Sequence, residues 1–360
     1  MEDLFVPDDI HINSHKGKYS VIFENNSLDI LRNESKENSI YIIDKNISKL
    51  YKSELRSIIE SKKCLIIEAS ESNKSLDKFP SYTKSLIDLG IKRNQTLVSI
   101  GGGIIQDISC FLASTLMRGL QWIFYPTTLL AQSDSCIGSK SSINSGDLKN
   151  ILGTFNPPKR VILDTNFLET LKKEDIYSGI GEMIKVHAID SLDSFKRISN
   201  DYEKILVESS SMAFYIHESL LMKKKLIEID EFDEGPRNVM NYGHSFGHAI
   251  ESATNYSIPH GIAVTIGMDM ANFVAAELNI STSYHFDRMH EVLDKNCSNF
   301  RNIEINVELL MNALYKDKKN TKNQLRLIFP DNEGQIMIDL YDKTPELQKG
   351  IANYLNLYQV

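Results

Sequence analysis

The chain has 360 residues, of which 42% are hydrophobic and 24% charged, and its formal net charge is -8 at pH 7. These are ordinary values for a soluble globular protein, and the length favours two domains over a single core. The acidic balance argues against nucleic acid as the main partner, because phosphate backbones are bound by basic surfaces.

The ends and the cysteines point to a reducing compartment. The acidic N-terminus lacks a basic segment with an apolar run behind it, and no apolar stretch reaches the length of a membrane span. The four cysteines are scattered without a C-x-x-C pair, so we expect neither a disulfide framework nor a thiolate zinc site. We therefore predict a cytoplasmic protein.

In the first half of the chain, short apolar runs alternate with segments of helical spacing. This alternation predicts a parallel sheet covered by helices. The runs that we interpret as strands are 39–44, 64–68, 96–100, 122–125 and 161–164.

The third of these strands runs directly into Gly101, Gly102 and Gly103, and an apolar helix over 104–117 follows. A glycine turn at a helix N-terminus can bring backbone N–H groups to a pyrophosphate, although it is not the G-x-G-x-x-G fingerprint and is also typical of a plain tight turn. Asp44, at the end of its strand, could accept a hydrogen bond from a ribose hydroxyl or simply cap a helix.

A polar stretch from 124 to 158 carries hydroxyl groups, Asp134 and two lysines, Lys140 and Lys149. Polar loops bounded by strands are common positions for functional sites. Each lysine alone is most simply a solvated charge. Together with Asn150 and Arg118, however, they offer the donors that a phosphate needs.

Beyond residue 170 the spacing becomes helical, so we place a domain boundary there. The helical segments are 172–189, 209–229, 239–254, 260–278 and 289–293, with a strand predicted at 325–329. Glu182 and Lys185 share one helical face, which is typical of an ordinary ion pair. Lys223 lies in a run of three lysines that by itself indicates only a solvated surface.

Three histidines lie close together in the sequence of this second half. His244 and His248 are four residues apart, which places both imidazoles on one helical face, and His260 follows a turn-prone segment. Three imidazoles favour a metal site, but the pattern is not H-E-x-x-H, and hydrogen-bonded histidines without a metal remain an alternative.

Taken together and in order, these motifs resemble those of the dehydroquinate synthase family, the sugar phosphate cyclases. The resemblance runs from about residue 40 to about residue 330 and rests on Gly101-Gly102-Gly103 with Asp107, Met117-Arg118-Gly119, Pro126-Thr127-Thr128 with Asp134, Gly138 with Lys140, Lys149-Asn150, Glu182 with Lys185, Arg237 with Asn241, His244 with His248 and Glu251, and His260-Gly261.

The resemblance implies an α/β fold, with a Rossmann-like parallel-sheet domain that binds NAD at 1–170 and an all-helical C-terminal domain at 171–360. It also implies a homodimer with the active site between the domains. The helical domain would bind zinc, or cobalt in its place, through Glu182, His244 and His260. On this interpretation His248 faces the substrate and is not a ligand.

The activity implied is that of 3-dehydroquinate synthases, which cyclise 3-deoxy-D-arabino-heptulosonate 7-phosphate for aromatic amino-acid synthesis. NAD oxidises a secondary alcohol, the ketone acidifies a neighbouring C–H, phosphate is eliminated, the ketone is reduced again and an aldol step closes the ring.

The same resemblance assigns roles to individual residues. The catalytic set is Asp134, Lys140, Lys185, Lys223, Arg237, Asn241 and His248. The substrate is expected to contact Arg118 of a second subunit, Lys140, Asn150, Lys223, Arg237, Asn241, His248 and Lys318. NAD is expected to contact Asp44, Asn46, Glu71, Lys74, Gly102, Gly103, Asp107, Thr127, Thr128, Asp134, Lys149 and Thr170.

The chain departs from the family pattern at Gln106, Ser139, Pro236 and Ile262. These changes lie beside functional positions, so they bear on substrate identity more than on the fold. The alternatives are another sugar phosphate cyclase of secondary or surface-glycan metabolism, a metal-dependent NAD alcohol dehydrogenase that accumulates NADH, and a non-catalytic relative. The lysine set argues against the dehydrogenase, because a small alcohol needs no phosphate-binding group.

Overall fold

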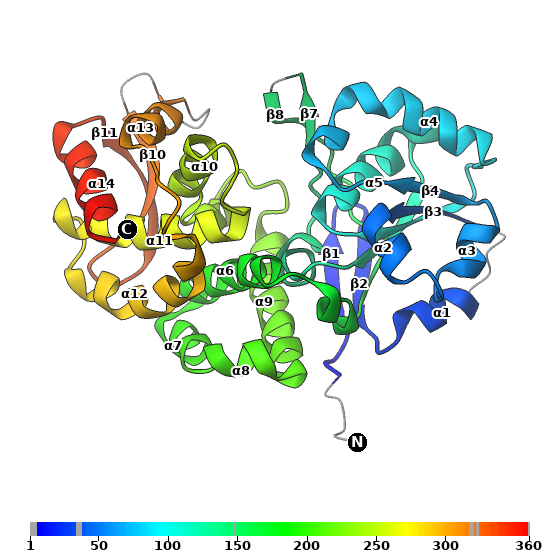
Figure 1. Cartoon of the computed structure of the whole chain (residues 1–360), viewed down its shortest axis with the longest axis horizontal. Helices are drawn as coiled ribbons and strands as arrows, with labels where there is room; N and C mark the ends of the chain where they lie inside the picture. Colours follow the sequence, from blue (N-terminus) through cyan, green and yellow to red (C-terminus); the bar gives the residue numbers. More distant parts are fainter. Residues whose placement is uncertain (1–5, 34–37, 147, 317–319, 322–323, 359–360) are drawn as a thin grey trace. The chain divides into compact units, whose positions relative to one another are not determined.

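The computed structural model describes residues 6–33, 38–146, 148–316, 320–321 and 324–358 (Figure 1). The chain forms two compact units. Unit 1 comprises Met1–Leu171 and Glu208–Asp233, and unit 2 comprises Lys172–Val207 and Glu234–Val360. The segment 208–233, which its spacing placed in the helical domain, is therefore part of unit 1.

Unit 1 is built on a seven-stranded sheet with the order β1-β2-β9-β6-β5-β3-β4. All neighbouring pairs are parallel except β1 and β2, an antiparallel edge that the apolar pattern did not predict. The predicted parallel sheet is confirmed. Its strands are β1 (Ile10–Ser14), β2 (Gly17–Phe23), β3 (Ser39–Asp44), β4 (Cys64–Ile67), β5 (Thr96–Gly101), β6 (Gln121–Pro126) and β9 (Arg160–Leu163).

The central strands are buried on both faces, which explains their continuous apolar sequence. Tyr41, Val98 and Tyr125, from β3, β5 and β6, are each only 1% exposed and belong to one apolar core. The helices of unit 1 are α1 (Ser27–Asn33), α2 (Lys45–Leu50), α3 (Arg56–Glu60), α4 (Phe79–Asp88), α5 (Gly103–Thr115) and α9 (Ser209–Ile229).

The polar stretch of the sequence forms a π-helix and a hairpin, and further short 3-10 helices lie elsewhere in unit 1. A five-residue π-helix, η5 (Ala131–Ser135), follows β6, and a hairpin of β7 (Ile143–Ser145) and β8 (Leu148–Leu152) comes next. Short 3-10 helices include η2 (Glu71–Lys74), η4 (Leu116–Arg118) and η6 (Thr165–Thr170). These segments carry seven of the predicted cofactor and substrate residues of unit 1: Glu71, Lys74, Arg118, Asp134, Lys149, Asn150 and Thr170.

Within the described residues, the regular elements of unit 2 are helices and one hairpin, β10 (Gln324–Pro330) with β11 (Ile336–Asp342). Its helices are α6 (Lys173–Asp190), α7 (Leu192–Asn200), α8 (Tyr202–Val207), α10 (His244–Ala253), α11 (His260–Glu277), α12 (Ser283–Cys297), α13 (Val307–Tyr315) and α14 (Pro345–Tyr358). The helix predicted at 289–293 is thus one part of the longer α12. Helix α11 is apolar on all sides because it packs against α6, α10, α12 and α14.

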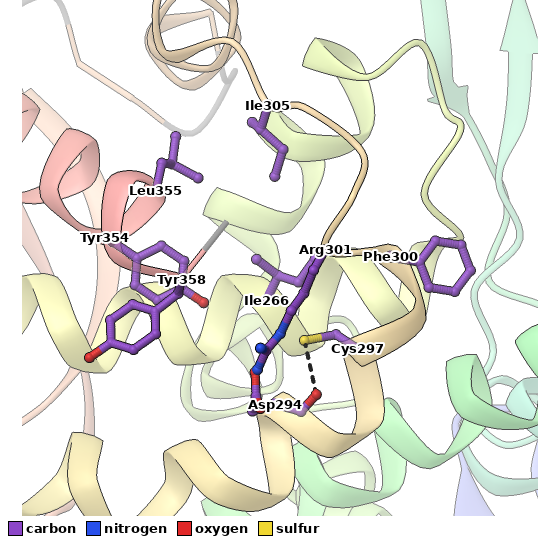
Figure 2. A pocket seen from close by; sticks show the side chains of 9 residues that line it. All are labelled: Ile266, Asp294, Cys297, Phe300, Arg301, Ile305, Tyr354, Leu355 and Tyr358. Carbon is purple, nitrogen blue, oxygen red and sulfur yellow. Dashed lines mark hydrogen bonds and ion pairs between the residues drawn. The ribbon is translucent and has the colours of Figure 1, made fainter. Parts of the chain in front are cut away.

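Figure 2 shows a cavity in unit 2 that is lined from α11, α12, η8 (Ser298–Phe300) and α14. Its volume of about 20 Å³ has room for a water molecule but not for a sugar phosphate. Cys297 donates from Sγ to the carbonyl oxygen of Asp294 there, and all four cysteines are free thiols, as predicted. No helix in the described ranges is long and apolar enough to cross a bilayer.

Candidate active site

The metal-site candidates of unit 2 meet because α6, α10 and α11 approach closely. A Cβ atom built on Gly261 would lie 1.8 Å from the carbonyl oxygen of Ser178, and one on Gly181 would lie 2.4 Å from that of Gly261. Only glycine permits such backbone contact between α6 and α11. Glu182, next to Gly181, is therefore brought beside His260, the first residue of α11.

Glu182, His244 and His260 have the geometry of metal ligands. The Glu182 Oε1 atom lies 3.7 Å from His244 Nε2 and 3.6 Å from His260 Nε2. Ligand atoms of a tetrahedral zinc ion, at about 2.1 Å from the metal, are about 3.4 Å apart. Glu182 is 2% exposed, and its Oε1 has no hydrogen-bond partner within the described ranges. An orphaned buried carboxylate oxygen beside two imidazole nitrogens is what a bound cation would satisfy.

The opposite ring nitrogens of both histidines are held by other groups. His244 Nδ1 lies 3.2 Å from the carbonyl oxygen of Tyr242, and His260 Nδ1 lies 3.1 Å from Glu251 Oε2. These acceptors favour the tautomer that carries its proton on Nδ1, which leaves the Nε2 lone pairs directed at Glu182. Carboxylate–histidine pairs of this kind orient metal ligands in many proteins.

The pKa values of the two histidines are shifted in opposite directions. Burial, together with Lys185, His260 and His248, holds the pKa of His244 well below its usual value, so this imidazole is neutral. Burial also lowers the pKa of His260, but the hydrogen bond and the charge of Glu251 outweigh it, so the net shift is upward. A cation at this position would compete with the proton for His260.

Two further residues contact this cluster. Lys185 donates to Glu182 Oε2 in a buried ion pair, which leaves Oε1 as the oxygen available to a ligand. His248 is exposed, and its ring nitrogen lies within 4.8 Å of those of His244 and His260. The histidines alone would thus form a second possible ligand set. The orphaned oxygen of Glu182 favours the set that includes the carboxylate.

In unit 1, the glycine turn after β5 lies against the segment after β6. Thr127 donates its backbone N–H to the carbonyl oxygen of Gly101 at 3.0 Å. A Cβ atom on Gly102, the N-cap of α5, would come within 2.8 Å of Thr128 Cγ2. Gly103 begins the helix, so Gly102, Gly103, Thr127 and Thr128 form one small surface at its N-terminus. This N-terminus is suited to an anionic group.

Predicted cofactor residues of unit 1 form one hydrogen-bonded network. Lys74 Nζ lies 3.3 Å from Asp107 Oδ2, 3.4 Å from Glu71 Oε1 and 2.9 Å from Asn150 Oδ1. Asn144 joins them, because its Nδ2 donates to Glu71 Oε1 and its Oδ1 accepts from Asn150 N. Burial raises the pKa of Asp107 to about 6, although Lys74 and the Ser142 N–H oppose the shift.

Other predicted cofactor residues lie at the N-cap of α2, on η6 and on β8. Asp44 caps α2, with its Oδ1 accepting from Asn46 N at 2.8 Å, so the cap alternative is confirmed. Burial raises the pKa of Asp44. Thr170, in η6, is exposed and lies 3.3 Å from the Tyr51 hydroxyl. Lys149 is exposed on β8.

The predicted substrate residues of unit 1 include one buried pair. Lys223, in α9, is 6% exposed, so the interpretation of the lysine run as a solvated surface is wrong for this residue. Its Nζ lies 3.0 Å from Asp134 Oδ1 and donates to the Asp134 carbonyl oxygen at 2.6 Å. Lys140 forms an ion pair with Asp233, a residue that the sequence did not single out. Arg118 is exposed on η4 with a positive φ of 66°.

The predicted substrate residues of unit 2 lie on η7 (Pro236–Asn241) and α10. Arg237 is 6% exposed, and Asn241 donates to the Asn238 carbonyl oxygen at 3.0 Å. Lys318 lies outside the described residues. Pro236 begins η7, where its fixed φ is compatible with a helical start, and Ile262 is fully buried in α11.

Sequence reasoning overlooked three contacts of these sites: Glu251 on His260, Asn144 in the lysine network, and Asp233 on Lys140. Glu251 and Asn144 could have been predicted, because Glu251 belongs to the histidine motif and Asn144 to the polar stretch 124–158. Gln106, one of the departures from the family pattern, directs its amide to Ser135.

Comparison with known proteins places this fold in a class. The structure matches that of 2-deoxy-scyllo-inosose synthase, solved with carbaglucose-6-phosphate, NAD+ and Co2+, at a TM-score of 0.85 and 22% identity over 96% of this chain and 100% of the other. It also matches 2-epi-5-epi-valiolone synthase from Streptomyces hygroscopicus, solved with NAD+ and Zn2+, at a TM-score of 0.80 and 20% identity over 94% and 97% of the chains. The chain therefore has the fold of these synthases.

The sequence comparison is more specific. Residues 64–178 match the family model of the 3-dehydroquinate synthase N-terminal part, and residues 179–320 match that of the C-terminal part. The chain is 36% identical to the 3-dehydroquinate synthase of Pelagibacter ubique, over 89% of this chain and 91% of the relative. It belongs to the 3-dehydroquinate synthase family, a family of carbon–oxygen lyases, and the resemblance found in its motifs is confirmed.

Proposed function

We propose that the protein is a 3-dehydroquinate synthase, which cyclises 3-deoxy-D-arabino-heptulosonate 7-phosphate to 3-dehydroquinate with elimination of phosphate. The observation that carries the proposal is the cluster of Glu182 Oε1 with the Nε2 atoms of His244 and His260. One carboxylate and two imidazoles suit zinc or cobalt and leave a coordination position for substrate oxygens. NAD would supply the hydride acceptor, and the metal would polarise the alcohol and ketone oxygens.

The residues of the chain would bind and orient these groups. Glu182, His244 and His260 would hold the metal, and Glu251 and Tyr242 would fix the two imidazoles. The glycine turn at Gly102 and the network around Lys74 and Asp107 would hold NAD. The glycine turn forms the N-terminus of α5, and Asp107 of the network lies in the same helix. This shared location in unit 1 supports the assignment.

Charged groups would recognise the substrate. Lys140 and Asn150 would bind its phosphate, and Lys223 and Arg237 its carboxylate, because a guanidinium suits a carboxylate bidentately. Lys223 is buried and forms an ion pair with Asp134. The free-energy cost of removing water from its ammonium group is therefore met on folding and does not oppose substrate binding. The identity to a 3-dehydroquinate synthase exceeds that to the two synthases of other names, which supports the heptulosonate substrate.

The proposal also includes a homodimer in which Arg118 serves the partner's site. Exposed apolar side chains on β8, among them Leu148 at 63% and Ile151 at 48%, offer a contact surface within unit 1. Light scattering on the purified protein tests the assembly, and Ile151→Lys should shift it toward monomer. We also propose a cytoplasmic location, in keeping with the four free thiols.

The decisive experiment measures phosphate release from the heptulosonate phosphate with catalytic NAD and added zinc or cobalt, while absorbance reports NADH. We expect phosphate release without net NADH, abolished by a chelator and restored by metal. No release from metal-loaded, NAD-bound protein would refute the substrate. Release from a ketose phosphate without a carboxylate would indicate another sugar phosphate cyclase, and stoichiometric NADH would indicate a dehydrogenase.

A further inference from the structure

We propose that Gln106 is a positioning residue: its side-chain amide holds the π-helix η5 in the shape that aims Asp134 at Lys223. This inference rests on the proposed function for its catalytic consequence, but its geometric part concerns unit 1 alone. Gln106 lies in the first turns of α5, is 6% exposed, and is 29 residues distant in sequence from the segment that it contacts.

Two hydrogen bonds of opposite polarity join Gln106 to Ser135. The Gln106 Nε2 atom donates to the Ser135 carbonyl oxygen at 2.5 Å, and the Ser135 hydroxyl donates to Gln106 Oε1 at 2.6 Å. A flipped amide would place its oxygen against the carbonyl oxygen, so this pairing accepts only one orientation. Both ends of the amide are thereby fixed to a single residue of η5.

The π-helix needs such contacts. Its closing hydrogen bond runs from Cys136 N to the carbonyl oxygen of Ala131 at 2.9 Å, five residues back. Helices of this kind are rare; they occur mostly as single turns, and frequently at functional sites. The carbonyl oxygens of Asp134 and Ser135, at the end of the turn, accept from side chains instead: Lys223 Nζ at 2.6 Å and Gln106 Nε2 at 2.5 Å. Helices α9 and α5 thus supply the two donors that hold adjacent carbonyl groups of η5.

The consequence for the site follows from the neighbours of Ser135. Asp134, one residue earlier, pairs with Lys223 through its carboxylate at 3.0 Å. On the other side, a Cβ atom built on Gly103 would lie 3.9 Å from Ser135 Oγ, so the serine lies over the glycine turn of α5. Gln106 therefore connects the proposed cofactor turn with the proposed substrate pair, although it is assigned a contact with neither ligand.

The test compares Gln106→Met, which keeps the length of the side chain but loses both hydrogen bonds, with Ser135→Ala, which loses only one. The matched control is Ser109→Ala, which removes another buried polar group from α5; Ser109 Oγ has no partner within the described ranges. Hydrogen exchange is measured over residues 131–136. We expect exchange in Gln106→Met to accelerate at least about tenfold, with a smaller change in Ser135→Ala and none in the control.

Steady-state rates of phosphate release complete the test, with kcat expressed per NAD-binding site. Because a misplacement of about 1 Å costs up to roughly 100-fold in rate, we expect kcat of Gln106→Met to fall about 10- to 100-fold, with KM changing much less. Unchanged exchange would overturn the proposal, and so would faster exchange with an unaltered kcat, which would mark a purely structural contact. If Gln106→Met does not fold, Ser135→Ala decides: faster exchange over 131–136 together with a lower kcat, both smaller than the changes expected of Gln106→Met, supports the proposal, and no change in either quantity overturns it. If the wild type releases no phosphate but exchange responds as expected, the proposed function fails while the geometric inference stands.

Discussion

The second carboxylate of the histidine cluster allows a graded test of the metal site. Glu251 Oε2 lies 3.1 Å from His260 Nδ1; the Glu251 side chain is 15% exposed and the His260 side chain 36% exposed, so the contact is partly shielded from water. Outer partners of metal-bound histidines are typically worth 10- to 100-fold in metal affinity. Glu251→Gln keeps an oxygen acceptor but loses the charge, whereas Glu251→Ala loses both.

We therefore expect Glu251→Gln to weaken zinc or cobalt binding by about 10-fold and Glu251→Ala by about 100-fold, or about 1.4 and 2.7 kcal/mol. The assay is competition with a chromophoric chelator after the protein has been stripped of metal. Glu291→Gln is the matched control, since it makes the same change in the exposed ion pair of Glu291 with Lys295 on α12. Wild-type affinity in both Glu251 variants would refute the ligand role of His260.

Three further predictions concern other groups. His260→Ala should lose metal and activity together, whereas His248→Ala should keep the metal and lose activity; metal loss in both, measured by metal analysis, would favour the three-histidine ligand set. Arg237→Ala should raise KM and lower kcat for a carboxylate substrate by a few kcal/mol at most in kcat/KM, about 3 as an upper estimate, and unchanged kinetics would place the carboxylate elsewhere. The pKa of Asp107 rises to about 6 in the folded protein, so the folded state binds more protons than the unfolded state between about pH 4 and 6. The free energy of unfolding of the wild type should therefore decrease as the pH is raised from about 4 to about 6. Relative to wild type, Asp107→Asn should gain up to about 3 kcal/mol between pH 4 and 7 in urea unfolding, and a pH-independent difference would contradict the shifted pKa.

The parallel strands of unit 1 and the long helices of unit 2 followed from the apolar pattern, because both are buried on several sides. The edge hairpin of β1 and β2 did not, since a half-buried edge strand carries a weaker signal. The hairpin β7–β8 was equally hidden: every residue of β8 is exposed, so no apolar alternation marks it.

The sequence pattern predicts which site residues lie together when they are close in the sequence. It does not predict contacts between residues that are far apart in the sequence and that only the fold brings together. The spacing of His244 and His248 indicates one helical face. No spacing, however, relates Glu182 to His260, which the glycine contact of α6 with α11 brings together. That assignment came from the family resemblance, and the geometry of the three atoms now supports it.

Lys223 illustrates why charge runs mislead. The three consecutive lysines of 223–225 suggest a solvated face, but successive residues on a helix point in directions about 100° apart. Only Lys223 turns inward, where it is 6% exposed and pairs with Asp134. Burying an ammonium group is costly unless a charge and hydrogen bonds compensate it, and Asp134 provides both through its carboxylate and its carbonyl oxygen. The inclusion of α9 in unit 1, despite its position in the sequence, is therefore what makes this pair possible, and the shape of η5 determines whether the pair is correctly aimed.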